Sequence, residues 1–114
     1  VRIPYILKKS VRKGKELNPL GKIPTDVWPK NNHTTSKEYA GWHPTQKPLE
    51  LLERIIKAHT NQGDVVLDCF SGSGSTAIAS INTNREFIGC ELDEEYFTKS
   101  MERINELTGV NRFI

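Results

Sequence analysis

The stretch DCFSGSGSTA at residues 68–77 constrains the fold more than any other, because an apolar run precedes it and a helix-like segment follows. Residues 72–77 fit the pattern Gly-x-Gly-x-x-Ala, in which the glycines permit a tight turn and close approach of a ligand, and the alanine lets the helix pack against the strand. Glu91 stands nineteen residues beyond the first glycine, at the end of the next apolar run. Turn and acid together predict a site for an adenosine-containing cofactor, whose ribose hydroxyls Glu91 would bind.

The glycine turn does not by itself identify the cofactor. Dinucleotides place a pyrophosphate at such a turn, but Asp68 at the strand end would repel a phosphate and could receive an ammonium group. This favours S-adenosylmethionine over a dinucleotide. Simpler interpretations stay open: Asp68 as a turn residue, and a turn that binds no ligand, with Glu91 exposed beside a helix cap.

Helical and strand-like segments alternate along the second half of the chain. Residues 49–59 carry apolar side chains at helical spacing, with Pro48 suited to the first helical position and Gly63 just beyond the end. A strand is expected in 64–70, a helix in 75–81, a second strand in 86–92, and a last helix between an Asp93 cap and Gly109. This order predicts the α/β class with parallel strands. A doubly wound domain needs more strands than these two, so the sheet is expected to be incomplete.

The two apolar runs are typical of strands buried on both faces. Cys69 and Cys90 each end one of these runs, and their spacing matches no zinc site, so both are expected to be packed, reduced thiols. No long apolar segment or signal-peptide pattern is present in the sequence. These features suggest a soluble protein of the cell interior.

Charge divides the chain into two parts. Residues 1–48 carry a balance of +7 and residues 49–114 one of −5, within a formal net charge of +2. A basic segment beside an acidic one suggests contact with a polyanion, although a solvated basic loop would have the same composition. Trp28, Tyr39 and Trp42 argue against a plain linker in the first part.

The chain resembles the C-terminal part of the DNA amino-methyltransferases, which methylate adenine N6 or cytosine N4. The resemblance covers about residues 41–107 and rests on the strings GWHPTQKPLELLERII, GDVVLDCFSGSGSTAIAS and FIGCELDEEYF. The element His-Pro-Thr-Gln-Lys-Pro, one helix ahead of the glycine turn, is its most specific part. The resemblance implies a doubly wound, Rossmann-like domain that uses S-adenosylmethionine, with the catalytic motif and the target-recognition region preceding the segments present here.

The resemblance also implies roles for individual residues. Around the methionine part of the cofactor it places Asp68, Phe70, Gly72 and Gly74, while Glu91 would hold the ribose and Leu92 would pack near the adenine. Thr45, Gln46 and Lys47 would close the opposite side, with Lys47 near the cofactor carboxylate or, alternatively, simply exposed to solvent. His43 is expected to be structural and hydrogen-bonded at the helix entry, since methylation of an amine needs little prior proton removal.

Double-stranded DNA is the partner that the resemblance implies. Residues 1–42 would be the end of the target-recognition segment and residues 43–114 the cofactor-binding part. Five basic residues would contact phosphates: Lys8, Lys9, Arg12, Lys13 and Lys15. The target base would be flipped out of the duplex, and adenine is favoured over cytosine. Such enzymes imply a prokaryotic or phage protein of the cytoplasm.

The catalytic signature of this family is missing from the sequence. The family uses Asp or Ser followed by Pro-Pro-Tyr or Pro-Pro-Phe, and the nearest string, Arg2-Ile3-Pro4-Tyr5, lacks the first proline and the acid or hydroxyl. We therefore expect a C-terminal fragment without a catalytic residue, inactive alone. The alternatives are an inactive S-adenosylmethionine- or DNA-binding remnant or subunit completed by a partner chain, and a fragment of a dinucleotide enzyme. An open sheet edge further predicts self-association.

Overall fold

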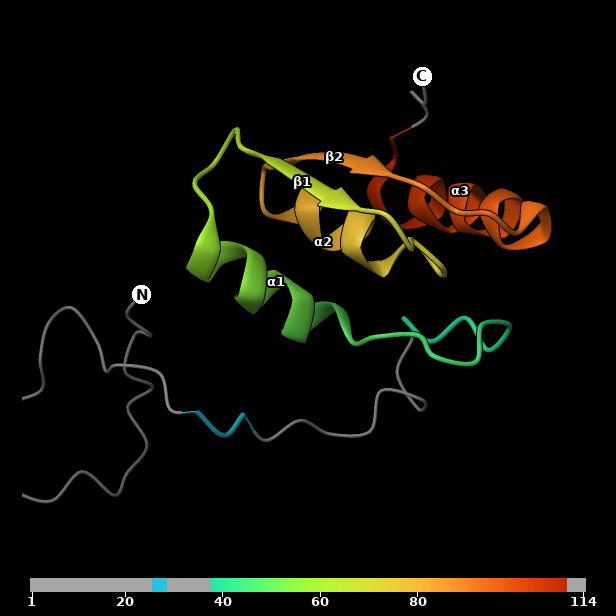
Figure 1. Cartoon of the computed structure of the whole chain (residues 1–114), viewed down its shortest axis with the longest axis horizontal. Helices are drawn as coiled ribbons and strands as arrows, with labels where there is room; N and C mark the ends of the chain where they lie inside the picture. The colour runs from blue at the N-terminus through green and yellow to red at the C-terminus, as the bar shows by residue number, and fades with distance from the viewer. Residues whose placement is uncertain (1–25, 29–37, 111–114) are drawn as a thin grey trace, which may run out of the picture.

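The computed structural model of the chain describes residues 26–28 and 38–110. The elements follow the order α1 (Leu49–His59), β1 (Val65–Asp68), α2 (Ser75–Asn82), β2 (Glu86–Gly89) and α3 (Glu94–Thr108) (Figure 1). The predicted order and the α/β class are confirmed. The five basic residues expected to contact DNA, from Lys8 to Lys15, lie outside the described residues.

The two strands pair in parallel. Val66 lies opposite Phe87 and Asp68 opposite Gly89, and α2 forms the crossover between the strands. Both strands therefore end at the same edge of the sheet, which brings the segment after Asp68 beside the segment after Gly89. Within the described residues the sheet has only these two strands, so the expectation of an incomplete sheet is confirmed.

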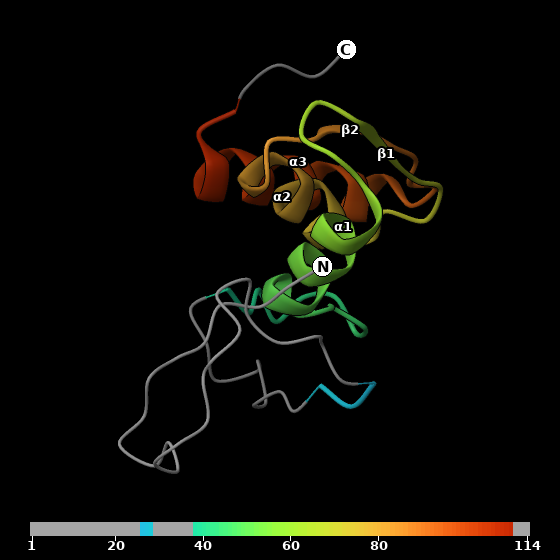
Figure 2. The ribbon, with the colours of Figure 1, turned by 90° about the vertical axis from the view of Figure 1, so that its left-hand side faces the viewer.

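Helix α2 is the centre of the packing. It contacts β2 and both other helices, and the helices lie on one side of the strand pair (Figures 1 and 2). Ala77, Ile78 and Ile104 form a buried cluster, against which Phe87 packs from β2, and Ile56 and Ala79 are buried as well. Ala77 is 1% exposed, so the small residue of the glycine pattern is buried, as that pattern predicts.

The expectation that both strands are buried is wrong for this chain. Val65, Leu67 and Ile88 are 52%, 63% and 57% exposed. Side chains alternate between the two faces of a strand, so Val66 and Phe87 share the face that α2 covers, while these three lie on a face that no described element covers. The apolar composition of β1 and β2 is nevertheless typical of strands that are covered on both faces.

The two cysteines also differ from expectation. Cys69 and Cys90 are free thiols, as predicted, but both are exposed rather than packed. Each lies one residue beyond the end of a strand.

Buried Arg85 joins the loops that follow α1 and α2. Its guanidinium donates to Thr60 Oγ1 at 2.9 Å, to the Thr60 carbonyl at 2.8 Å and to the Thr83 carbonyl. Thr83 is the C-cap of α2. The arginine thus fixes the ends of two helices relative to each other at the edge of the sheet remote from the glycine turn.

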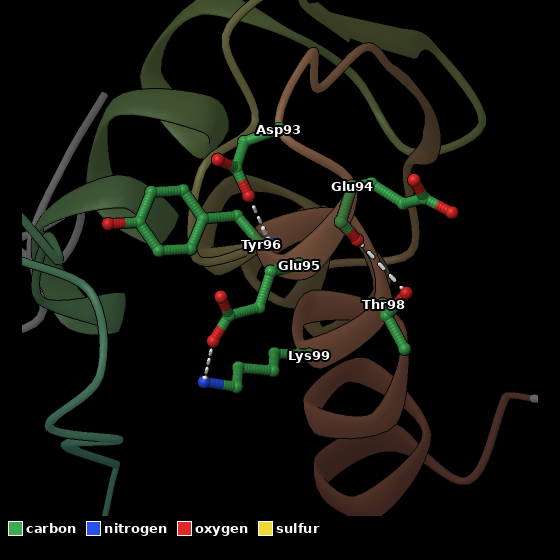
Figure 3. Close-up of polar contacts among 6 residues, drawn as sticks. All are labelled: Asp93, Glu94, Glu95, Tyr96, Thr98 and Lys99. Atoms are coloured by element: carbon green, nitrogen blue, oxygen red, sulfur yellow. Dashed lines mark hydrogen bonds and ion pairs between the residues drawn. The ribbon is translucent and has the colours of Figure 1, made fainter.

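The predicted ends of the helices are confirmed with one shift. Asp93 caps α3 by accepting the Tyr96 backbone N–H at 2.9 Å (Figure 3), and Gly109 ends it at φ 71°. Pro48 is the N-cap of α1 rather than its first residue, with extended backbone at ψ 135°. In the described part of the chain, no helix combines the length and apolar character that crossing a membrane requires.

Candidate functional site

The turn between β1 and α2 is attached to the end of β2 by backbone hydrogen bonds. Cys90 N–H donates to the Asp68 carbonyl at 3.0 Å, and Ser71 N–H donates to the Cys90 carbonyl at 2.8 Å. Gly74 N–H then closes the turn onto the Ser71 carbonyl at 2.9 Å. These bonds bring the glycines and the acid at the end of β2 together, as the sequence pattern predicts.

Glu91 binds directly to the glycine turn. Its Oε2 accepts the Gly72 backbone N–H at 2.7 Å, and its Oε1 accepts the Asp93 backbone N–H at 3.0 Å. Since a carboxylate has about four lone-pair sites, both oxygens retain capacity for further donors such as ribose hydroxyls. The carboxylate therefore has a structural role in the turn that sequence reasoning missed, in addition to the ligand role it predicted.

Glycine is needed at positions 72 and 74 of the turn because of the backbone conformation and because of different neighbouring side chains. Both have positive φ, 53° at Gly72 and 79° at Gly74, a region that glycine occupies without steric cost. A Cβ on Gly72 would lie 2.9 Å from His43 Nε2, and one on Gly74 would lie 3.1 Å from Ile104 Cδ1. Gly74 is thus required by the packing of α3 against the turn, whether or not a ligand approaches it.

Two large apolar side chains are exposed at this edge of the sheet. Phe70 is 91% exposed and Leu92 is fully exposed, one after each strand. Between them in the sequence lie the glycine turn and Glu91. Asp68, at the end of β1, accepts the Phe70 backbone N–H at 3.0 Å, so the expected turn role of this aspartate is present. An edge with apolar side chains on both strands around backbone N–H groups and carboxylates suits an adenosine ligand.

The loop that carries the His-Pro-Thr-Gln-Lys-Pro element folds on itself. His43 Nδ1 accepts the Thr45 backbone N–H at 3.2 Å, which confirms a hydrogen-bonded histidine before α1. Lys47 is exposed and its Nζ donates to the Thr45 carbonyl at 2.9 Å. Thr45 is exposed as well. Both side chains are accessible to a ligand.

Gln46 differs from its two neighbours because it is buried, at 5% exposure. Its Oε1 accepts the Ala40 backbone N–H at 3.0 Å, and its Nε2 donates to the Glu38 carbonyl at 2.7 Å. Both ends of the amide therefore bind the segment that precedes the loop. The predicted role at the cofactor would need a second function for the same side chain.

His43 also connects the loop to α3 through an aromatic contact. Its ring centroid lies 4.7 Å from that of Tyr96, and Trp42 lies 6.1 Å from both. Tyr96 projects from the first turn of α3, away from Glu94 (Figure 3). Sequence reasoning missed Tyr96, although an aromatic side chain in the first turn after a cap residue is a detectable signal.

Arg103 is the second residue that sequence reasoning missed. It is 5% exposed, and its Nη1 donates to the Ser73 carbonyl at 2.8 Å and to Ser75 Oγ at 2.9 Å. Burial lowers the pKa of its guanidinium, while nearby Glu38 raises it. Arg103 shares the buried side of α3 with Ser100 and Ile104. A charged residue on a helix face that is otherwise packed is the sequence signal that could have identified it.

Comparisons with known proteins identify the family of the chain. The model of the N6/N4 DNA methylase family matches residues 2–102. Type II methyltransferase M1.MboII of Moraxella bovis is 39% identical over 93% of this chain and 44% of its own length. DNA adenine methyltransferase YhdJ of Escherichia coli is 44% identical over 74% of this chain and 29% of its own length.

A solved structure shares the fold of the described region. The crystal structure of the M1.HpyAVI–SAM complex superposes with a TM-score of 0.53 and 53% identity, covering 54% of this chain and 32% of that one. The chain thus spans less than half of the relatives it matches. Because the family model covers most of its length, the chain belongs to the N6/N4 DNA methylase family.

Proposed function

We propose that the chain forms the S-adenosylmethionine-binding part of a DNA amino-methyltransferase. The observation that carries the proposal is the 2.7 Å hydrogen bond from Gly72 N–H to Glu91, which fixes an acid of one strand end against the glycine turn of the other. A solved relative of 53% identity is a SAM complex, which supports the choice of cofactor.

The residues of this edge would divide the cofactor among them. Asp68 would receive the ammonium group, Phe70 and Leu92 would cover apolar surface, and Glu91 would accept the ribose hydroxyls. The backbone at Gly72 and Gly74 would lie against the methionine part, and Thr45, Gln46 and Lys47 would close the opposite side. When bound, the cofactor supplies an activated methyl group on its sulfonium. The chain's own contribution is to orient it.

DNA is the proposed substrate, with adenine N6 favoured over cytosine N4. The name of the relative YhdJ gives adenine, and the balance of +7 in residues 1–48 suits a phosphate backbone. Residues 1–42 would be the end of the recognition segment and residues 43–114 the cofactor part. The basic residues from Lys8 to Lys15 would make binding weaken as salt rises. Action on DNA in a bacterial or phage setting is the reason to expect a cytoplasmic location.

Catalysis would need a further segment that carries the Asp-Pro-Pro-Tyr type of motif, which this sequence lacks. We propose that this segment covers the sheet face formed by Val65, Leu67 and Ile88, each more than half exposed, whether it belongs to the same polypeptide or to a partner. The chain by itself would bind the cofactor and be inactive. The alternative is that the chain is an inactive binding subunit. In the simplest case, a second copy of the chain would cover the same face by self-association.

The first test is calorimetric titration of the chain with S-adenosylmethionine and, separately, with NAD. We expect saturable binding of S-adenosylmethionine and none of NAD. Preference for NAD would contradict the assignment of the cofactor. Adding a segment with the catalytic motif, taken from a related methyltransferase, should then restore methyl transfer to duplex DNA, whereas persistent inactivity of a stable complex would favour the binding subunit.

A further inference from the structure

The short segment Glu38–Ala40 is bound by side chains from two distant parts of the fold. The Glu38 carbonyl accepts Gln46 Nε2 at 2.7 Å and Arg103 Nη2 at 3.1 Å. The Glu38 carboxylate accepts the Leu49 N–H at 3.1 Å, at the beginning of α1, where Pro48 provides no side-chain cap. The segment is therefore fixed at once to α1, to α3 and to the loop of residues 43–48 that carries Gln46, called the cofactor loop below.

Arg103 continues from this segment to the glycine turn. While Nη2 binds Glu38, Nη1 binds the Ser73 carbonyl and Ser75 Oγ. Ser73 stands between two glycines of positive φ, so the neighbouring residues restrict its peptide groups less than other residues would. The peptide that joins Ser73 to Gly74 is held at its oxygen by Arg103 and at its nitrogen by the Ser71 carbonyl. Removing the arginine would release one of these two restraints.

The environment of Arg103 does not favour stability alone. Its Nε is buried and has no hydrogen-bond partner among the described residues, and an unpaired buried N–H of a charged group is costly. An apolar side chain of similar volume often serves stability as well as a buried charge does. The rigid guanidinium of Arg103 binds carbonyl groups on two different segments, which an apolar side chain cannot do.

We infer that Arg103 is a positioning residue, which couples the segment Glu38–Ala40 to the glycine turn and so sets the geometry of the cofactor site. The inference rests on the proposed function, because the turn is the proposed cofactor site. Glu38–Ala40 lies two residues before the cofactor loop, within the last part of the proposed recognition segment. A displacement of that segment, as on DNA contact, would therefore reach the turn through Arg103 and alter cofactor affinity.

The matched variants are Arg103→Lys and Arg85→Lys. Both arginines are at least nine-tenths buried and donate three hydrogen bonds to backbone or hydroxyl oxygens, but Arg85 contacts only Thr60 and Thr83. Lysine retains the charge and loses the fork. We expect Arg103→Lys to weaken S-adenosylmethionine binding about tenfold, as the loss of roughly 1.4 kcal/mol would, and Arg85→Lys to leave it within about twofold at similar loss of stability. Equal effects of the two variants would overturn the inference.

A second measurement needs no ligand and separates this inference from the proposed function. Gln46→Ala removes two hydrogen bonds to Glu38–Ala40, and its effect on the amide NMR signals of Ser73 and Ser75 can be followed with and without Arg103→Lys. Coupling through Arg103 predicts that these signals move with the arginine present and stay unchanged in the lysine background. Identical shifts in both backgrounds would contradict it. If the chain binds no S-adenosylmethionine, the proposed function fails and the NMR comparison still decides the coupling.

Discussion

The glycine turn and the outer face of the sheet, formed by Val65, Leu67 and Ile88, lie a few residues apart but differ in how many contacts they make with described residues. At the turn, the backbone of residues 68–74 is hydrogen-bonded to the end of β2, to Glu91 and to Arg103. On the outer face, Leu67 and Ile88 lie opposite each other in register and are both more than half exposed. The proposed cofactor turn is therefore held by hydrogen bonds between described residues, whereas no described element covers the outer face of the sheet that carries it.

This difference has a thermodynamic consequence. Apolar side chains on an uncovered face contribute little to the stability of this chain, because they remain in water. If another segment covered these side chains, their burial would stabilise the association of that segment with the outer face. The turn needs no such addition to reach its hydrogen-bonded geometry.

Matched isoleucines on the two sides of the sheet should show the largest difference. Ile78→Ala, at a fully buried position in α2, should lower the free energy of unfolding by about 2–5 kcal/mol. Ile88→Ala, on the outer face, should change it by about 0.5 kcal/mol or less. Urea unfolding followed by circular dichroism measures both. Similar losses would mean that the outer face is already covered, for example by a second copy of the chain.

The turn can be tested by placing a methyl group on Gly74. Gly74→Ala combines a positive φ with a Cβ 3.1 Å from Ile104 and 3.2 Å from Ser100, so we expect a loss of about 2–4 kcal/mol. Gly63→Ala is the control, because its φ is +87° and no atom of the described part of the chain lies within 4 Å of the added Cβ. That variant should lose only the conformational part, about 1–2 kcal/mol. Equal losses would show that α3 yields to the methyl group and that the packing against the turn is loose.

A smaller effect is expected at Asp93, the N-cap of α3, which lies two residues after Glu91. Asp93→Ala removes the acceptor of the Tyr96 N–H (Figure 3) and should cost about 1 kcal/mol. Asp93→Asn retains an acceptor and should cost much less. Thermal unfolding of the two variants gives the comparison. If both lose the same stability, the charge at the helix N-terminus matters more than the hydrogen bond.

The smallest effect concerns the ion pair between Lys99 and Glu95 on the surface of α3 (Figure 3). The hydrogen bond to Glu95 raises the pKa of Lys99 above its usual value. A lysine whose pKa is raised in the folded state stabilises the fold below about pH 10.4. This contribution is lost as the pH rises through the folded-state pKa. The difference in melting temperature between the wild type and Lys99→Gln should therefore be small at pH 8 and vanish at high pH. A difference that grows with pH would contradict the assignment.

The local elements could be predicted from the sequence because their signals are local. Pro48, Asp93 and Gly109 mark helix ends within a turn, and the glycine pattern with Glu91 predicts that two strand ends meet, which the Gly72–Glu91 hydrogen bond confirms. The exposure of the strands could not be predicted, because an apolar run describes the sheet to which a strand is suited and does not reveal which layers are present.

Two of the contacts that sequence reasoning missed converge on the segment Glu38–Ala40. Arg103 reaches Glu38, sixty-five residues earlier in the chain, and Gln46 turns its amide to the same segment rather than to the glycine turn. Neither partner can be read from spacing, because the Arg103 contact joins distant segments and the Gln46 contacts lie within an irregular loop. The residues expected to contact DNA stay a prediction, since they lie outside the described part of the chain.

The central claim is that Glu91, fixed against the glycine turn, binds the ribose of S-adenosylmethionine. The most direct test is calorimetric titration of the wild type and of Glu91→Ala at a temperature where both are folded. The account predicts saturable binding by the wild type and at least tenfold weaker binding by the variant, because several hydrogen bonds to a charged acceptor are lost. Equal affinity of the two folded proteins would contradict it and would leave Glu91 a residue that only shapes the turn.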